Sequence, residues 1–173
     1  RKQEFDAALA DFDKAIEVFQ RNERKRLVAG IYSSQARIHI EKRNYKAAVA
    51  AYGRALEFNP GWIEYRFERG KLLLEKTKEP RQAISDFSEI LKYRPNSVPI
   101  YLARAKGWEQ LEDFPRMDAD LTKAINLRPY YAQSYYQRAF AYKDRGQCKK
   151  AIADFAQVIR LREANLLDRA FIN

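Results

Sequence analysis

A repeat of about 34 residues is the feature that most limits how this chain can fold. From Ser134 to Leu161, apolar residues recur at steps of three and four, stop at Arg145-Gly146-Gln147, and then resume. This spacing puts the apolar side chains on one face of each of two short helices joined by a tight turn. The pattern returns three times at earlier positions, in copies that end at Pro60, Pro95 and Pro129.

The second helix of each copy carries an alanine followed four residues later by an aromatic residue. The pairs are Ala8/Phe12, Ala48/Tyr52, Ala83/Phe87 and Ala151/Phe155. The third full copy departs from this pattern, with Met117 and Leu121 at the same places. The second full copy has one residue more than the others, which we expect in the turn from Thr77 to Glu79. Because residues 5–15 match a second helix alone, we expect the array to begin inside a repeat.

These residues resemble the tetratricopeptide repeat (TPR), a helix-turn-helix of 34 residues whose signature includes A-x3-F and a closing proline. The resemblance extends from Arg1 to about Glu163. It implies an all-α fold, a right-handed α-solenoid of antiparallel helix pairs with about nine helices, in a fragment of a longer chain. Gln20 and Glu163 stand where proline is expected, so we predict that those two helices run past the usual stop.

The repeat spacing also predicts how the chain is divided. Residues 1–29 are a second helix of a truncated repeat plus a basic insertion, and residues 166–173 either cap the last repeat or continue its helix. The four full repeats are expected at 30–62, 63–97, 98–131 and 132–165.

The net charge of +10 comes from 33 basic and 23 acidic residues. The excess is spread over the repeats, and the third full repeat is neutral. The densest run, Arg21 to Arg26, is either a solvated helix end, where cations favour the helix dipole, or a docking site for an acidic surface or a phosphate. A diffuse basic excess does not by itself select a nucleic-acid partner.

The composition argues against an enzyme or a metal site. The single cysteine and the single histidine, Cys148 and His39, lie three repeats apart, and we interpret both as packing residues. Zinc sites and cysteine–histidine catalysis need more such ligands or a paired base. The sequence shows no phosphate-binding loop, no apolar run near the roughly 20 residues that cross a bilayer, and no cofactor motif. The low cysteine content fits an intracellular, cytoplasmic chain.

One charge pattern recurs with the repeat. An arginine in the first helix accompanies an aspartate in the second helix in three repeats: Arg69 with Asp86, Arg104 with Asp120, and Arg138 with Asp154. The remaining full repeat has Gln35 and Ala51 and so lacks both partners. We predict an arginine–carboxylate pair, either between the two helices of a repeat or between neighbouring repeats.

A second face of each first helix lies one residue beyond the packing positions, about 100° around the helix. The resemblance implies that this face lines an inner groove that holds peptides or partner helices. The face includes Ser33, Leu74 and Leu102, and its candidate binding residues are Arg37, Phe67, Lys71, Lys106, Tyr136, Phe140 and Lys143. Aromatic rings and cations suit a protein or peptide that bears apolar and acidic groups. Alternatively, neighbouring repeats cover the rings and the cations are simply solvated.

Several functions remain open at this stage. The leading hypothesis is a non-enzymatic scaffold or adaptor that binds a protein or peptide through the groove. The alternative is an RNA-binding or polyanion-binding module, in which Tyr136 and Phe140 stack on bases. An accessory region of an enzyme and self-association through the terminal repeats are further possibilities. The lysine, asparagine and arginine with which some family members grip chaperone tails are missing, since those positions carry Ser33, Glu68 and Ala103.

Overall fold

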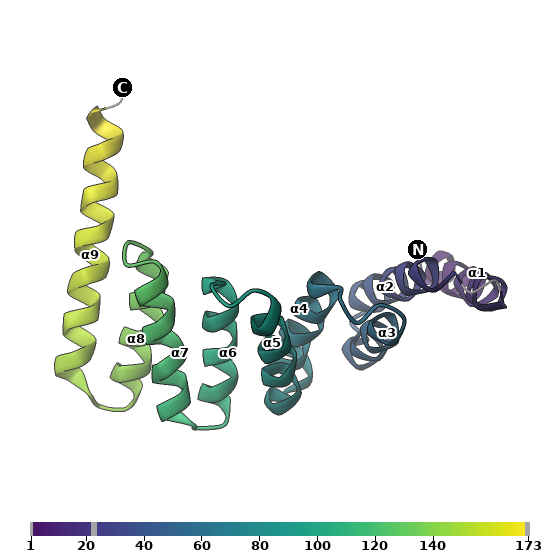
Figure 1. Cartoon of the computed structure of the whole chain (residues 1–173), viewed down its shortest axis with the longest axis horizontal. Coiled ribbons are helices and arrows are strands. Elements are labelled where there is room, and N and C mark those ends of the chain that lie inside the picture. The colour runs from purple at the N-terminus through teal and green to yellow at the C-terminus, as the bar shows by residue number, and fades with distance from the viewer. Residues whose placement is uncertain (1, 22–23, 172–173) are drawn as a thin grey trace. The chain divides into compact units, whose positions relative to one another are not determined.

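The computed structural model describes the backbone of residues 2–21 and 24–171, and side chains within 3–20 and 24–162. The described residues form helices and turns without a strand, which confirms the all-α prediction. In chain order the elements are α1 (Lys2–Arg21), α2 (Lys25–Glu41), α3 (Tyr45–Phe58), α4 (Ile63–Leu72), the π-helical turn η1 (Leu73–Thr77), α5 (Pro80–Tyr93), α6 (Val98–Gln110), α7 (Phe114–Leu127), α8 (Ala132–Asp144) and α9 (Cys148–Phe171) (Figure 1).

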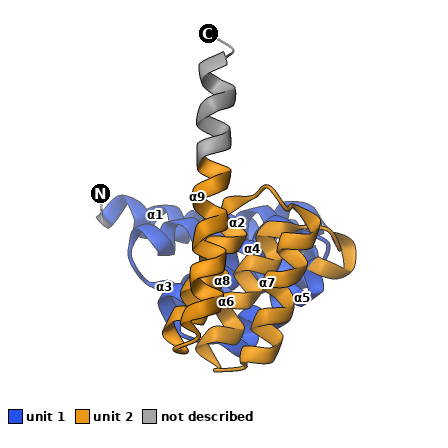
Figure 2. Ribbon diagram, turned by 90° about the vertical axis from the view of Figure 1, so that its left-hand side faces the viewer, with its two compact units in different colours: residues 1–90 blue, residues 91–173 orange. Residues whose placement is uncertain are grey.

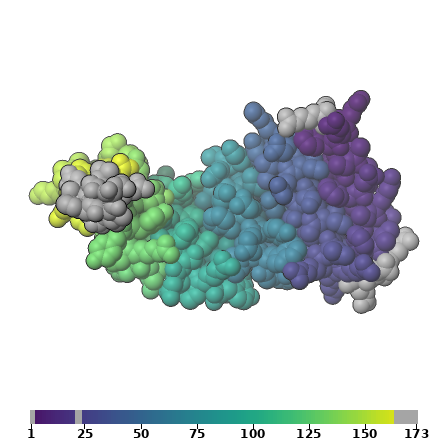
Figure 3. Space-filling view, turned by 90° about the horizontal axis from the view of Figure 1, so that it is seen from above, coloured from purple at the N-terminus to yellow at the C-terminus, as the bar shows by residue number. Residues whose placement is uncertain are grey.

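The chain divides into two compact units, Arg1–Ile90 and Leu91–Asn173 (Figure 2). Within each unit, helices that follow one another in sequence contact each other, and the colour of the surface changes gradually along each unit (Figure 3). The closest pairs are α2 with α3, α6 with α7, and α8 with α9. These are the predicted helical hairpins, each formed because neither amphipathic helix can bury its apolar face alone.

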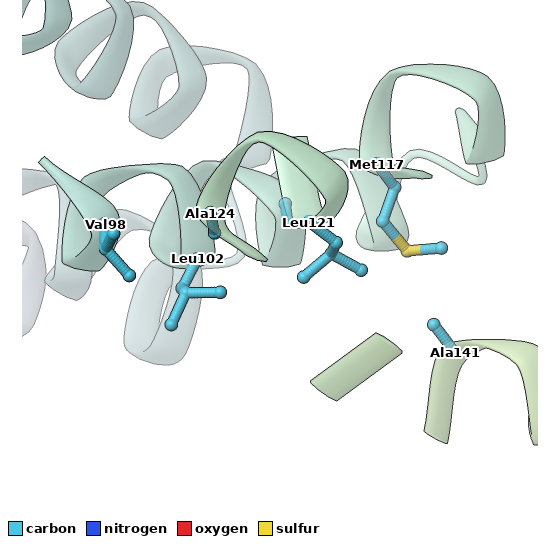
Figure 4. Close-up of a cluster of buried hydrophobic side chains, with 7 residues drawn as sticks. Val98, Leu102, Met117, Leu121, Ala124 and Ala141 are labelled. Carbon is cyan, nitrogen blue, oxygen red and sulfur yellow. The ribbon is translucent and has the colours of Figure 1, made fainter. Parts of the chain in front are cut away.

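Many of the buried residues are those that the apolar spacing predicts. In unit 1, Ala36 packs with Ala48 and Tyr52. In unit 2, Val98, Leu102 and Ala105 of α6 pack with residues of the two helices that follow: Met117, Leu121 and Ala124 of α7 and Ala141 of α8 (Figure 4).

The apolar spacing between Ser134 and Leu161 also predicts that Ile159 packs, and this prediction was wrong. Ile159 in α9 is 57% exposed, whereas the equivalent Ile125 in α7 is 7% exposed. The difference follows from the order of the helices, because α8 packs against α7 and no helix follows α9 in the described part of the chain. The burial of this position depends on the next repeat and not on its own.

A left-handed residue recurs in each hairpin turn. The φ angles are 55° at Arg43, 60° at Lys78, 56° at Glu112 and 69° at Gly146. Glycine adopts this conformation without a steric cost, whereas other residues pay for the contact between Cβ and the backbone. Three of the four turns therefore carry a strained residue, and Gly146 alone has the residue type that the backbone favours.

The additional residue of the second full repeat lies before this turn. Lys78 keeps the left-handed position of the other turns, so the prediction of an insertion at Thr77 to Glu79 was placed too late. The residue is absorbed by η1, since a π-helical turn holds more residues than an α-helical one.

The helix ends follow the prolines. Where proline is missing, α1 runs to Arg21 and α9 runs to Phe171, as predicted. The segment expected at 166–173 continues α9 up to Phe171, and its last two residues lie outside the described chain. The basic run from Arg21 to Arg26 spans the junction of α1 and α2, of which residues 22–23 are not described. Helix α2 begins at Lys25, so residue 30, the predicted start of the first full repeat, lies within it.

The predicted arginine–carboxylate pairs form between the two helices of a repeat. Arg104 donates from Nε and Nη2 to the two carboxylate oxygens of Asp120, at 2.8 and 2.7 Å. The other two pairs have the same bidentate geometry, with distances of 2.6 to 2.8 Å in Arg69–Asp86 and Arg138–Asp154. The three aspartates are buried and the arginines are partly exposed, so each arginine neutralises a buried carboxylate, with Arg66 as a second cation at Asp86, 3.5 Å away.

The repeat without this pair uses a different bond. Gln35 of α2 donates to Asp13 of α1 at 2.8 Å. In unit 2, Arg138 also donates from Nη1 to Thr122 of the preceding repeat, at 3.2 Å. By repeat spacing, Thr122 and Asp13 occupy equivalent positions of their helices. The same first-helix position therefore bonds to the preceding second helix even where its own aspartate is absent.

We expect the Arg104–Asp120 pair to couple strongly in a double-mutant cycle. Arg104→Ala, Asp120→Ala and the double mutant should give a coupling of about 1–3 kcal/mol in the free energy of unfolding, because either single mutant leaves a partly buried charge unpaired. Urea denaturation measures the effect. The control is the exposed Arg54–Glu57 pair, 3.0 Å apart, for which we expect less than about 0.5 kcal/mol. Additive losses at Arg104 and Asp120 would contradict the prediction.

The turn geometry makes opposite predictions for two equivalent positions. Glu112→Gly should raise the free energy of unfolding by about 0.5–1 kcal/mol, since it relieves the left-handed strain but adds entropy to the unfolded chain. Gly146→Ala should lower it by about 1 kcal/mol. Thermal and urea denaturation give both values, with Glu112→Ala as a control that keeps the strain. Equal stability of Glu112→Gly and Glu112→Ala would show that the turn is not strained.

Candidate functional site

The candidate residues of unit 1 lie on one face of two first helices. Arg37 of α2 is exposed, and Phe67 and Lys71 of α4 are partly buried. The ring centroids of Phe67 and Phe87 are 6.0 Å apart. Lys71 Nζ donates to the carboxylate of Glu68 at 3.1 and 3.2 Å and lies 5.5 Å from the Phe67 centroid. Phe67 therefore packs against Phe87 of its own repeat, and Lys71 is paired with the carboxylate of Glu68.

The candidate residues of unit 2 include an exposed aromatic cluster, formed by Tyr136, Phe140 and Phe155. Tyr136 is 41% exposed and Phe140 is 36% exposed. Their centroids are 4.7 Å apart, and the Phe155 ring meets Phe140 edge to face at 5.3 Å. Lys143 Nζ lies 5.3 Å from the Phe140 centroid. Such tilted and edge-to-face contacts hold the rings in place while leaving apolar surface open to solvent.

A pocket of about 230 Å³ lies beside this cluster, between the third and fourth full repeats. Its apolar lining comes from Ala105, Met117, Leu121 and Ala141, and its other lining residues are Lys106, Glu109, Gln133, Tyr136, Gln137 and Phe140. Figure 4 shows Met117 and Leu121 pointing toward the side on which Ala141 lies. The pocket thus has an apolar floor and a rim of mixed polar and aromatic groups.

The structure brings together three of the residues predicted from the sequence, Lys106, Tyr136 and Phe140, which all line the pocket. Lys143 lies beside the pocket against Phe140. Among the described side chains, Lys106 has no carboxylate within salt-bridge distance. Its ammonium group is therefore available to a ligand, unlike that of Lys71.

The predicted face is not open along its whole length. It was expected to include Ser33, Leu74 and Leu102, and all three are buried. The two glutamines of the lining, Gln133 and Gln137, were missed, as were the apolar residues of the floor. Both glutamines lie on α8, four residues apart, with Gln133 three residues before Tyr136 and Gln137 directly after it, and this spacing is the signal that could have identified them.

Cys148 and His39 lie in different units, in α9 and α2 respectively. Cys148 is exposed at the start of α9, so the prediction that it fills a packing position was wrong. His39 is partly buried, and burial together with the nearby Lys42 lowers its pKa, which fits the packing role predicted for it. No cluster of histidine, cysteine and carboxylate side chains that could hold a metal ion occurs among the described residues. Within the same limits, none of the helices has the length and apolar character of a membrane span.

Comparisons with known proteins give the family of these repeats. A family model described as the tetratricopeptide repeat matches residues 29–61 and 132–165. Rat (Rattus norvegicus) sperm-associated antigen 1 is 31% identical over 94 residues, which cover 54% of this chain and 10% of that protein. Hsp70-Hsp90 organizing protein 3 of Arabidopsis thaliana is 28% identical over 129 residues, which cover 74% of this chain and 22% of that protein. The chain thus spans a small part of the curated relatives it matches.

Solved structures share the fold at low sequence identity. YrrB, described as a TPR protein with an unusual peptide-binding site, has a TM-score of 0.74 and 18% identity, with 95% of this chain and 81% of that chain covered. MamA from Desulfovibrio magneticus has a TM-score of 0.72 and 17% identity, with 94% and 93% covered. These similarities confirm the predicted α-solenoid fold class. The two matched segments, residues 29–61 and 132–165, are tetratricopeptide repeats.

Proposed function

We propose that this chain is a non-enzymatic scaffold or adaptor that binds a protein or peptide through the face formed by its first helices. The proposed binding residues are Arg37, Phe67, Lys71, Lys106, Tyr136, Phe140 and Lys143. The observation that carries the proposal is the pocket beside the exposed aromatic cluster. A concave apolar site with a few polar groups at its rim is typical of a binding site, and aromatic side chains are favoured anchors at interfaces.

The partner should bear apolar and acidic groups. The exposed rings of Tyr136 and Phe140 offer apolar contact, and Lys106 offers a cation that no described carboxylate occupies. The similarity to an organizing protein named after two chaperones supports a protein partner in general. It does not support a chaperone tail in particular, because the tail-gripping set is replaced at Ser33, Glu68 and Ala103.

The alternative function is binding of RNA or another polyanion. It is favoured by the net charge of +10 and by an exposed ring pair on which bases could stack. The neutral charge of the third full repeat argues against it, since this repeat contributes half of the pocket. The two functions differ in their response to salt, because contacts with phosphates weaken steeply as the salt concentration rises.

We expect a triple mutant of the proposed face to lose its protein partner. Phe67→Ala/Tyr136→Ala/Phe140→Ala removes three rings of the proposed face, of which Tyr136 and Phe140 are exposed and Phe67 is partly buried. Affinity capture from lysate at two salt concentrations, with mass spectrometry and nucleic-acid analysis, should recover from the wild type a protein that withstands the higher salt. The triple mutant should retain less than about a tenth of it, which corresponds to a loss of more than 1.4 kcal/mol.

The matched control for this experiment is Tyr93→Ala/Tyr130→Ala, which removes two exposed tyrosines outside the proposed face. The control should capture as much partner as the wild type, and circular dichroism should show equal helicity in all three proteins. Capture of nucleic acid that leaves at the higher salt would favour the alternative function. Unchanged capture of protein by the triple mutant would contradict the proposed face.

A further inference from the structure

The pocket lies where the repeat pattern is broken twice. In the second helices, the position of Leu121 carries an aromatic residue in the other full repeats: Tyr52, Phe87 and Phe155. In the first helices, the position of Phe140 carries a cation in the other full repeats: Arg37, Lys71 and Lys106. Leu121 and Phe140 both line the pocket. The two departures from the repeat therefore meet at one place.

The aromatic ring fills the space beneath the first helix in the other repeats. Phe87 is fully buried, and its ring lies so close to α4 that a Cβ atom added at Gly70 would be 2.7 Å from it. Tyr52 is also buried, and Phe155 supports Phe140 at 5.3 Å. Leu121 is shorter than these aromatic side chains and does not fill the corresponding space beneath α6. The pocket therefore occupies volume that the aromatic side chain fills in the other full repeats.

We propose that this pocket is an anchor site that takes one bulky apolar side chain of an extended peptide, with an adjacent acidic residue held by Lys106. The inference rests on the proposed function and names the ligand chemistry of its central subsite. A volume of about 230 Å³ is below the 300–1,000 Å³ of sites for whole small molecules. It suits a single side chain.

The polar rim fits an extended backbone. Gln133 and Gln137 line the pocket one turn apart on α8, and each amide offers both donors and an acceptor to a peptide group. Lys106 supplies the positive charge, and Glu109, one turn further along α6, would repel a second carboxylate. The acidic residue of the peptide is therefore expected on one side of the anchor only.

A selection with a phage-displayed library of random 12-residue peptides tests the site. The purified chain should enrich peptides with an aromatic or large aliphatic residue next to aspartate or glutamate, and titration calorimetry should give the affinity of one such synthetic peptide. Leu121→Phe restores the residue type of the other repeats and fills the pocket. This variant should bind the peptide at least about tenfold more weakly, while its melting temperature stays at or above that of the wild type.

Two further variants keep the test decisive. Ala141→Leu fills the pocket from the opposite wall with the residue that α4 carries at the equivalent Leu72, so it covers the case in which Leu121→Phe does not fold. Ile159→Phe adds the same kind of bulk at an exposed position outside the pocket and should bind as the wild type does. Lys106→Gln should reduce affinity only for peptides that contain the acidic residue.

The outcomes separate this inference from the proposed function. Equal binding of the peptide by the wild type and by folded pocket-filling variants, or no enrichment by the wild type, would overturn the anchor site. If the anchor site is overturned but the triple mutant of the face loses its partner in lysate capture, the proposed function is retained without this subsite. If capture by the triple mutant also equals that of the wild type, the proposed function fails as well.

Discussion

The contact between a small residue of the first helix and a bulky residue of the second helix determines the geometry of every repeat. Gly70 faces Phe87 so closely that even a methyl group would collide with the ring, and the equivalent alanines of the other repeats are buried: Ala36, Ala105 and Ala139. Close approach of two helices requires small side chains at the crossing point. The same contact sets the distance between the two helices of a repeat. It therefore also sets the volume that side chains between the helices must fill.

The arginine–aspartate pairs restrict how the two helices that make this contact can be aligned along their axes. A buried ion pair gains little net stability, because desolvation of the charges offsets most of their attraction. The bidentate geometry of Arg104 on Asp120, however, is satisfied at only one alignment of α6 and α7. Gln35 shows what remains when the aspartate is lost, since it bonds to the preceding helix at Asp13 instead. We infer that the pairs select one alignment of the two helices among several apolar ones.

The repeat made most of the fold predictable. Recurrence within one chain acts as internal evidence, so the helix pairs and the arginine–aspartate partners could be read from spacing alone. Exposure at Ile159 and Cys148 could not, because it depends on a following helix and on where α9 begins. The location of the π-helical turn was missed because either side of the turn could absorb an added residue. At the site, spacing identified Lys106, Tyr136 and Phe140, but not the pocket, because a missing ring leaves no motif.

Positions that recur in the repeats and positions that do not recur therefore carry different information. A residue type that returns in every repeat satisfies a requirement that every repeat has, and packing is the requirement they share. A specific ligand contacts only part of the array, so its recognition must depend on residues that differ between repeats. Leu121 and Phe140 are such residues, and each departs from its repeat in a direction that enlarges apolar surface at the same pocket. If the residues at these two positions had changed independently, nothing would place both changes at the same pocket. Selection for one binding site would favour both changes.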